Sequence, residues 1–256
     1  DAGYREIVLT GIHITSYGRD TGDVDLITLI EDIHDIEGIE RIRLGSLEPN
    51  YIDSEFIKRI CNLPKMCPHY HISLQSGSDS TLKRMGRRYT SSEYRDIVKN
   101  LRKANPDVSI TTDVMVGFPG ETDSEFNETY DFVEDISFSK IHVFQYSPRE
   151  GTPAANFPDQ VQSKVKAARS EKLIELGKRL EEQFMNKFLG REEKVLFEQL
   201  TTGSRDMYEG YTENYIKVTA SSQSDIQNQI VPTLLERVKG ESIIGSIQKV
   251  DEKEGF

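Results

Sequence analysis

The chain has 256 residues and a formal net charge of −11, and 36% of its residues are hydrophobic. This length suits one α/β domain of barrel size followed by a smaller domain, and the composition excludes a disordered chain. No apolar run approaches the ~20 residues of a membrane helix, and no signal segment opens the chain. The two cysteines, Cys61 and Cys67, exclude a disulfide-rich scaffold, have the wrong spacing for a zinc pair and suit a cytoplasmic protein.

The chain opens on an apolar strand without a starting methionine, which favours a fragment or a processed form. Five short apolar runs rich in β-branched residues then predict strands. The runs are Arg5–Ile12, Ile39–Leu47, Tyr70–Gln75, Val108–Phe118 and Lys140–Tyr146. Helical patterns separate them, with one start at Asp53 and two capping boxes, Thr90–Glu93 and Thr122–Glu125. This alternation predicts a parallel sheet, either doubly wound or barrel-like.

A long helix is predicted from about residue 160 to 189, because apolar residues recur there at steps of three and four. Its other face is basic, and we interpret that face, which includes Lys166 and Arg169, as solvated rather than as an RNA-binding stripe. Beyond Gly190, short strands between glycines predict a small all-β barrel. These strands are Glu193–Phe197, Met207–Thr212, Tyr215–Thr219 and Ser242–Val250. The expected domains are therefore residues 1–189 and 190–256.

Polar, glycine-bearing segments follow all five predicted strands of the sheet. They are residues 10–13 (TGIH), 44–49 (LGSLEP), 74–79 (LQSGSD), 116–122 (VGFPGET) and 146–152 (YSPREGT). Taken singly, each has an ordinary explanation, such as a helix cap at Gln75, a tight turn at Gly117 or a buried, hydrogen-bonded His13. Ligands of parallel α/β folds bind beyond the carboxyl ends of the strands. Together, the segments therefore predict a site for a polar, nucleotide-sized ligand.

A basic cluster at Lys83–Arg88 follows the third predicted strand. Such a cluster could hold a carboxylate or phosphate, contact an RNA backbone, or lie in water. We favour contact between one arginine and the carboxylate of a small molecule, with the other basic side chains solvated.

As a set, the segments EIVLTGIHITSYGRD, RIRLGSLEP, HISLQSGSDSTLKRMGRRYT, TTDVMVGFPGETDSEF and HVFQYSPREGTPAA are recognisable. They resemble the radical S-adenosylmethionine (SAM) barrel of the MiaB/MtaB-like methylthiotransferases. The LTGIH–SYG form is similar to the MtaB type, which acts on threonylcarbamoyladenosine beside the tRNA anticodon. Residues 191–250 resemble a TRAM domain, a small RNA-contacting β-barrel. The resemblance implies an α/β fold with a partial, open, TIM-like parallel barrel, followed by that β-barrel.

The resemblance also implies a SAM site, without identifying a catalytic side chain. Its cofactor-binding residues would be Gly11, His13, Ser46, Glu48, Gln75, Ser76, Arg84, Arg88, Val116, Gly117, Tyr146 and Arg149. Gly11 would approach the SAM amino group, and Arg84 or Arg88 its carboxylate. The backbone at Val116–Gly117 and Tyr146 would meet the adenine. The implied partners are tRNA and a protein that reduces the cluster, with no membrane.

The chain departs from this family in its cysteines. Members carry a CxxxCxxC motif after the first barrel strand and three more cysteines in an N-terminal domain, and neither set is present here. A [4Fe–4S] cluster needs thiolate ligands, so the clusters belong to a full-length protein and no metal ligands are expected in this chain. The chain alone is expected to be inactive and to lack one barrel strand, which would leave Glu6–Leu9 as an exposed edge.

Three other functions fit parts of the sequence. The first, within the family, is methylthiolation of a ribosomal protein aspartate. The second is a non-catalytic RNA-binding module. The acidic charge of the β-barrel argues against it, because residues 195–256 hold 6 Lys and Arg and 10 Asp and Glu, a net charge of −4. The third is a metal-free barrel enzyme for a small phosphorylated substrate.

Overall fold

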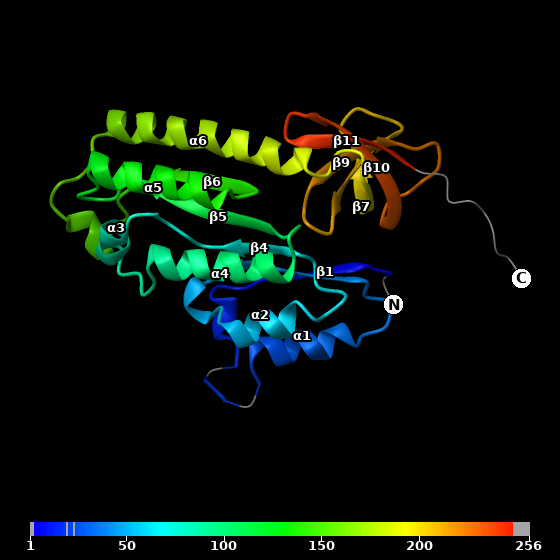
Figure 1. Ribbon diagram of the computed structural model, residues 1–256, viewed down its shortest axis with the longest axis horizontal. Coiled ribbons are helices and arrows are strands. Elements are labelled where there is room, and N and C mark those ends of the chain that lie inside the picture. The colour runs from blue at the N-terminus through cyan, green and yellow to red at the C-terminus, as the bar shows by residue number, and fades with distance from the viewer. Residues whose placement is uncertain (1–2, 19, 23, 248–256) are drawn as a thin grey trace, which may run out of the picture.

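The computed structural model describes residues 3–18, 20–22 and 24–247. An α/β part and a small β-barrel are joined by one long helix (Figure 1). In its described residues the α/β part contains six strands, which are β1 (Glu6–Leu9), β2 (Arg41–Leu44), β3 (Ser46–Leu47), β4 (His69–Ile72), β5 (Ser109–Val116) and β6 (Lys140–Gln145). Among the described residues, no helix combines the length and the apolar character that crossing a membrane requires.

All pairings among these six strands are parallel. β1 pairs with β2, and β3 to β6 form a second run in chain order. Gly45 separates β2 from β3, and its N–H donates to the carbonyl of Leu9 at the end of β1. Within the described chain, β1 and β6 do not pair with each other, so these parallel strands form an open arrangement rather than a closed barrel. The predicted edge position of Glu6–Leu9 is confirmed.

Six α-helices in the described part of the chain connect and cover the strands. They are α1 (Leu26–His34), α2 (Ser54–Ile60), α3 (Asp79–Arg84), α4 (Ser91–Ala104), α5 (Asp123–Ile136) and α6 (Ser163–Asn186), with short 3-10 turns η1 (Ile14–Ser16), η2 (Pro49–Tyr51) and η3 (Pro153–Asn156). The three predicted helix starts are confirmed. Asp53 accepts the N–H of Phe56, and Thr90 and Thr122 both form complete capping boxes. A side-chain cap of this kind stabilises a helix by about 1 kcal/mol.

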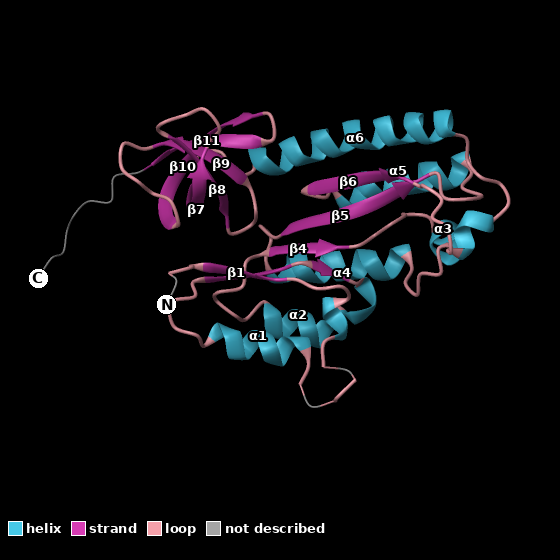
Figure 2. Cartoon of the chain, turned by 180° about the vertical axis from the view of Figure 1, so that it is seen from behind, coloured by secondary structure: helices cyan, strands magenta, loops and turns pink. Residues whose placement is uncertain are grey.

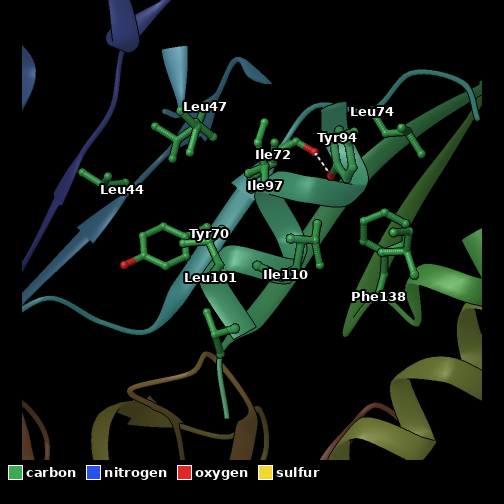
Figure 3. Packing of buried hydrophobic residues seen from close by; sticks show 14 of the residues in the cluster. Leu44, Leu47, Tyr70, Ile72, Leu74, Tyr94, Ile97, Leu101, Ile110 and Phe138 are labelled. Carbon is green, nitrogen blue, oxygen red and sulfur yellow. Dashed lines mark hydrogen bonds between the residues drawn. The ribbon is translucent and has the colours of Figure 1, made fainter. Parts of the chain in front are cut away.

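The core lies between the sheet and its helices. Ile72 and Val114 of the sheet have no exposed surface, and Tyr94 of α4 is completely buried among them. Figure 3 shows Tyr94 beside Ile72, whose carbonyl accepts a hydrogen bond from the Tyr94 hydroxyl at 2.7 Å. Each large apolar side chain buried in this way stabilises the fold by about 1.5–3 kcal/mol. The near-continuous hydrophobic strands of the sequence are explained by this coverage.

The small barrel is closed. Its strands are β7 (Glu192–Leu200), β8 (Met207–Thr212), β9 (Lys217–Ser221), β10 (Gln229–Lys239) and β11 (Ser242–Ile247), in the spatial order β10-β11-β9-β8-β7. β10, which closes the barrel by pairing with β7, was not among the predicted strands because Pro232 interrupts its pattern. The last three residues of the predicted strand Ser242–Val250 lie outside the described residues. Phe184 and Phe188 extend the barrel core onto the end of α6.

The small barrel packs against the amino ends of the sheet strands, opposite α3 (Figure 2). Two buried arginines of β2 contribute hydrogen bonds to this contact. Arg41 donates to the carbonyls of Lys194 and Tyr211, and Arg43 donates to the carbonyl of Glu213. The barrel therefore closes one end of the sheet and leaves the carboxyl ends of the strands free.

Candidate functional site

The carboxyl ends of the parallel strands form one rim, where the loops after β1, β3, β4, β5 and β6 emerge. This is the end at which α3 lies in Figure 2. A cavity of about 400 Å³ opens there. Its lining residues are His13, Ser16, Glu48, Pro49, Asn50, Tyr51, Ser73, Gly86, Arg87, Arg88 and Tyr89. The structure thus brings His13, Glu48 and Arg88, three of the predicted cofactor-binding residues, to one cavity. We refer to it as the mouth cavity.

His13 and Glu48 form the polar pair of the mouth cavity. His13 has a left-handed backbone (φ 56°) just before η1, and Glu48 precedes Pro49 at the start of η2. The Nδ1 atom of His13 lies 2.5 Å from Oε1 of Glu48. Because a carboxylate only accepts hydrogen bonds, this nitrogen carries the proton. The pair presents an imidazole and a carboxylate to the cavity, which suits a ligand with hydroxyl or ammonium groups.

Arg88 reaches the mouth cavity from the loop after α3. The left-handed Gly86 (φ 72°) turns the chain there, and the hydroxyl of Tyr89 anchors it by donating to the carbonyls of Ser73 and Leu74. Burial raises the pKa of Tyr89 to about 12, so its phenol stays a donor at neutral pH. Arg88 also lines a neighbouring cavity of about 520 Å³. Arg88 therefore contributes a cationic side chain to the lining of both cavities.

Arg84, the other predicted carboxylate partner, is engaged within the protein. Its guanidinium donates two hydrogen bonds of 2.8 Å to the carboxylate of Glu125 and a third to the hydroxyl of Thr81. Glu125 belongs to the capping box of α5, so this pair ties α3 to α5. Of the two arginines, Arg88 is the one that lines the mouth cavity.

Gln75 and Ser76 follow β4 at the rim but have different surroundings. Gln75 has a left-handed backbone (φ 66°), and its N–H and carbonyl bond to β5 across the end of the sheet. Ser76 is 1% exposed, and its hydroxyl lies 3.0 Å from that of Thr129 on α5. The Ser76 hydroxyl therefore connects a loop to a helix, whereas the Gln75 side chain stays partly exposed at the rim.

Val116, Gly117 and Tyr146 form the part of the rim at β5 and β6. The Tyr146 N–H donates to the carbonyl of Val116 at 2.9 Å, which joins the two strand ends. Gly117 is left-handed (φ 72°), and its N–H donates to Oε1 of Glu121 at 3.0 Å. Tyr146 is buried edge-on against Phe118, and within the described chain its hydroxyl has no hydrogen-bond partner. This buried hydroxyl is therefore free to bond a ligand group or a water molecule.

The other predicted residues lie in exposed segments near the strand ends. Gly11 follows β1, Ser46 begins β3, and both residues are exposed. Arg149 is also exposed, in the turn after β6, where its carbonyl accepts from Thr152. Sequence reasoning missed Ser73 and Tyr89 of the mouth cavity. Ser73 lies one residue beyond β4, and Tyr89 directly follows the arginines of the basic cluster. These positions were the available signals in the sequence.

A [4Fe–4S] cluster does not fit the side chains of this chain. Cys61 lies exposed at the end of α2, and Cys67 is buried at 1% exposure before β4. Burial raises the pKa of the Cys67 thiol to about 12, against the formation of a thiolate ligand. Among the described residues, no group of three or more His, Cys, Asp or Glu side chains could hold a metal ion.

Residues 1–133 match the family model described as the radical SAM superfamily. Over 234 residues the chain is 42% identical to threonylcarbamoyladenosine tRNA methylthiotransferase MtaB of Bacillus subtilis, a match that covers 90% of this chain and 52% of that protein. Over 246 residues it is 36% identical to tRNA-2-methylthio-N(6)-dimethylallyladenosine synthase of Acetivibrio thermocellus, covering 96% of this chain and 51% of that protein. The chain therefore spans about half the length of these relatives.

Among solved structures, coproporphyrinogen III oxidase of Escherichia coli, a radical SAM enzyme, superposes with a TM-score of 0.50 at 11% sequence identity. The superposition covers 82% of this chain and 54% of that one, and at this identity it supports the fold alone. The family match extends over more than half of the chain, and the resemblance expected from the motifs is confirmed. The chain belongs to the radical SAM superfamily and, within it, to the MtaB/MiaB-like family.

Proposed function

We propose that this chain is the SAM-binding part of a methylthiotransferase that modifies threonylcarbamoyladenosine in tRNA. The observation that carries the proposal is the mouth cavity, where His13, Glu48 and Arg88 meet at the carboxyl ends of the strands. Its volume of about 400 Å³ lies within the range of small-molecule sites and suits a nucleoside-sized ligand. The two relatives at 42% and 36% identity are named for tRNA methylthiolation.

The residues at the rim suit the chemical groups of SAM. Arg88 supplies a cation for the methionine carboxylate, and the carboxylate of Glu48 supplies acceptors for an ammonium or for ribose hydroxyls. Gly117 and Tyr146 bring backbone from two strand ends to the region assigned to the adenine. When bound, SAM would supply the radical and the methyl group that methylthiolation requires. The side chains of this chain bind and orient that molecule.

The substrate assignment rests on the form of the first loop. Gly11-Ile-His13 is the form expected of the threonylcarbamoyladenosine enzymes, and His13 borders the mouth cavity. We infer that tRNA is the substrate, that a reductant protein is a partner and that the protein works in the cytoplasm. The five-stranded barrel, residues 192–247, is proposed to be a TRAM-like module that contacts the tRNA.

The cluster ligands are proposed to come from outside the 256 residues. The two cysteines do not form a ligand set, so no step of the reaction is assigned to them. The chain by itself is accordingly proposed to be inactive.

Calorimetric titration of the chain with SAM tests the proposal. We expect saturable binding that Arg88→Met weakens by about 10-fold or more, since a hydrogen bond to a charged group contributes about 1.5–3 kcal/mol. Arg205→Met, at an exposed position between β7 and β8, is the matched control and should bind like the parent. Binding of inorganic phosphate in place of SAM would instead support an enzyme for phosphorylated substrates.

The substrate is tested by mass spectrometry of tRNA nucleosides from a strain that lacks the gene. Loss of the 2-methylthio group from threonylcarbamoyladenosine is the expected result. Intact tRNA nucleosides together with an unmodified ribosomal protein aspartate would assign the protein to the sibling activity instead.

A further inference from the structure

The first turns of α6 hold the two loops at the β5 and β6 side of the rim. The Nζ atom of Lys166 donates to the carbonyl of Tyr146 at 2.8 Å. On its way there, the Lys166 side chain crosses Gly117, where an added Cβ would lie 2.1 Å from the Lys166 Cγ. Gly117 therefore has two reasons to be glycine, its left-handed backbone and the lysine stem that packs against it.

Arg169, one turn further along α6, holds the same loop through Glu121. Its side chain is 7% exposed and that of Glu121 is 3% exposed. Nη1 of Arg169 donates to Oε1 of Glu121 at 2.6 Å and to its carbonyl at 3.1 Å, while Nη2 donates to Asp123 at 2.7 Å. The same Oε1 accepts the N–H of Gly117 at 3.0 Å. The helix, the carboxylate and the strand end thus form one continuous hydrogen-bonded connection.

The expectation of a fully solvated basic face on α6 is wrong at these positions. Arg169 is buried and Lys166 is half-buried, whereas Lys172 on the next turn is exposed. Burial raises the pKa of Glu121, and the neighbouring Arg169 opposes that rise. Removing the guanidinium would leave a buried carboxylate without its cation, which is strongly destabilising when only one partner of a buried pair is lost.

We propose that Lys166 and Arg169 are positioning residues for the adenosyl group of SAM, because they fix the backbone of Gly117 and Tyr146 before the ligand arrives. This inference rests on the proposed function, which assigns those two backbone segments to the adenine. A loop that is ordered in advance loses less conformational entropy when the ligand binds, so its ligand binds more tightly. Neither side chain is assigned a contact with the ligand.

The test compares Lys166→Met and Arg169→Met with the parent chain. Lys172→Met is the matched control, since it removes an exposed lysine from the same helix. Amide hydrogen exchange at Gly117 and Tyr146 reports on loop order without any ligand, and calorimetry with SAM and with adenosine reports on the site. Val114, in the middle of β5, is the internal reference for exchange.

Lys166→Met is expected to speed exchange at the Tyr146 amide, and Arg169→Met at the Gly117 amide, each by about 10-fold. Both variants should weaken the binding of SAM and adenosine by a similar factor. Exchange at Val114 and the behaviour of Lys172→Met should match the parent. Arg169→Lys keeps the charge beside Glu121 and should recover part of both effects. If Arg169→Met fails to fold, Lys166→Met still decides, because it leaves the buried ion pair intact.

Unchanged exchange and unchanged affinity in Lys166→Met would overturn the proposal. Faster exchange with full affinity would show that the two side chains order loops that the ligand does not use, and would also overturn it. If the parent itself binds neither SAM nor adenosine, the proposed function fails and the adenosyl ligand named here fails with it. The exchange data would then still show whether α6 holds the loops.

Discussion

His69 makes the stability of this protein depend on pH in a way that the structure specifies. It is the first residue of β4, it is 5% exposed, and its ring stacks on Tyr215 of the small barrel with a centroid distance of 4.6 Å. Its Nε2 lies 3.2 Å from the hydroxyl of Thr111, and among the described residues its Nδ1 has no hydrogen-bond partner. Burial, with smaller contributions from Arg43 and His71, lowers the pKa of His69 to about 3.

The sign of the effect follows from the ordinary pKa of 6.5 in the unfolded chain. Between pH 6.5 and about 3 the unfolded chain binds a proton at His69 that the folded chain does not bind. The contribution of neutral His69 to stability is therefore complete above pH 6.5 and is lost as the pH falls through this window. One titrating group changes the free energy of unfolding by about 1.4 kcal/mol per pH unit, so roughly 2–3 kcal/mol is lost between pH 6.5 and 4.5.

Urea unfolding of the parent and His69→Phe at pH 7 and pH 4.5 measures this contribution. Phenylalanine keeps an aromatic ring against Tyr215 and cannot be protonated, so the deficit of the variant at pH 7 should shrink by roughly 2–3 kcal/mol at pH 4.5. Thr111→Val is the control, because it removes the hydroxyl and leaves the imidazole. Its deficit of about 1 kcal/mol should be nearly the same at both values. Equal pH responses of the parent and His69→Phe would refute the reasoning.

Three further outcomes are expected. Gly210→Ala would place a Cβ 2.1 Å from the carbonyl oxygen of Leu196, so β7 and β8 must separate. Calorimetric melting should therefore show a marked loss of stability in the small barrel, and an unchanged melting curve would contradict the close approach. Tyr94→Phe removes the buried hydrogen bond to Ile72 and should lower the free energy of unfolding by about 1 kcal/mol in urea titrations, with no change expected only if water replaces the hydroxyl. Reconstitution of the 256-residue chain with iron and sulfide should yield no stoichiometric cluster absorbance, since Cys67 is buried; a robust cluster signal would disprove this.

Local patterns in the sequence were sufficient to predict most elements of the α/β part. The five predicted strand regions overlap β1 to β6, because the second region covers both β2 and β3, and the capping boxes at Thr90 and Thr122 begin α4 and α5 as expected. These signals are local, because a capping box needs four consecutive residues and a buried strand needs one apolar run. The motifs at the strand ends also identified the family, which the comparisons confirmed.

The tertiary structure decided which of the polar residues act together. The sequence did not distinguish Arg84 from Arg88 as the partner of the SAM carboxylate. Only the folded chain pairs Arg84 with Glu125 and leaves Arg88 at the mouth cavity. The basic face of α6 gave no sign that Arg169 bonds to Glu121, which lies 48 residues earlier. The contact of Arg41 with the small barrel spans 153 residues.

The physical reason is the range of the interactions. Helix caps and apolar periodicity arise between residues a few positions apart, so they can be read directly from the chain. Ion pairs, cavities and barrel closure depend on which distant segments meet, and many pairings are compatible with the same composition. The sequence by itself therefore determined the elements, the family and the rim of the sheet. Only the three-dimensional arrangement showed which arginine lines the mouth cavity, that α6 bonds to the rim, and that β10 closes the small barrel.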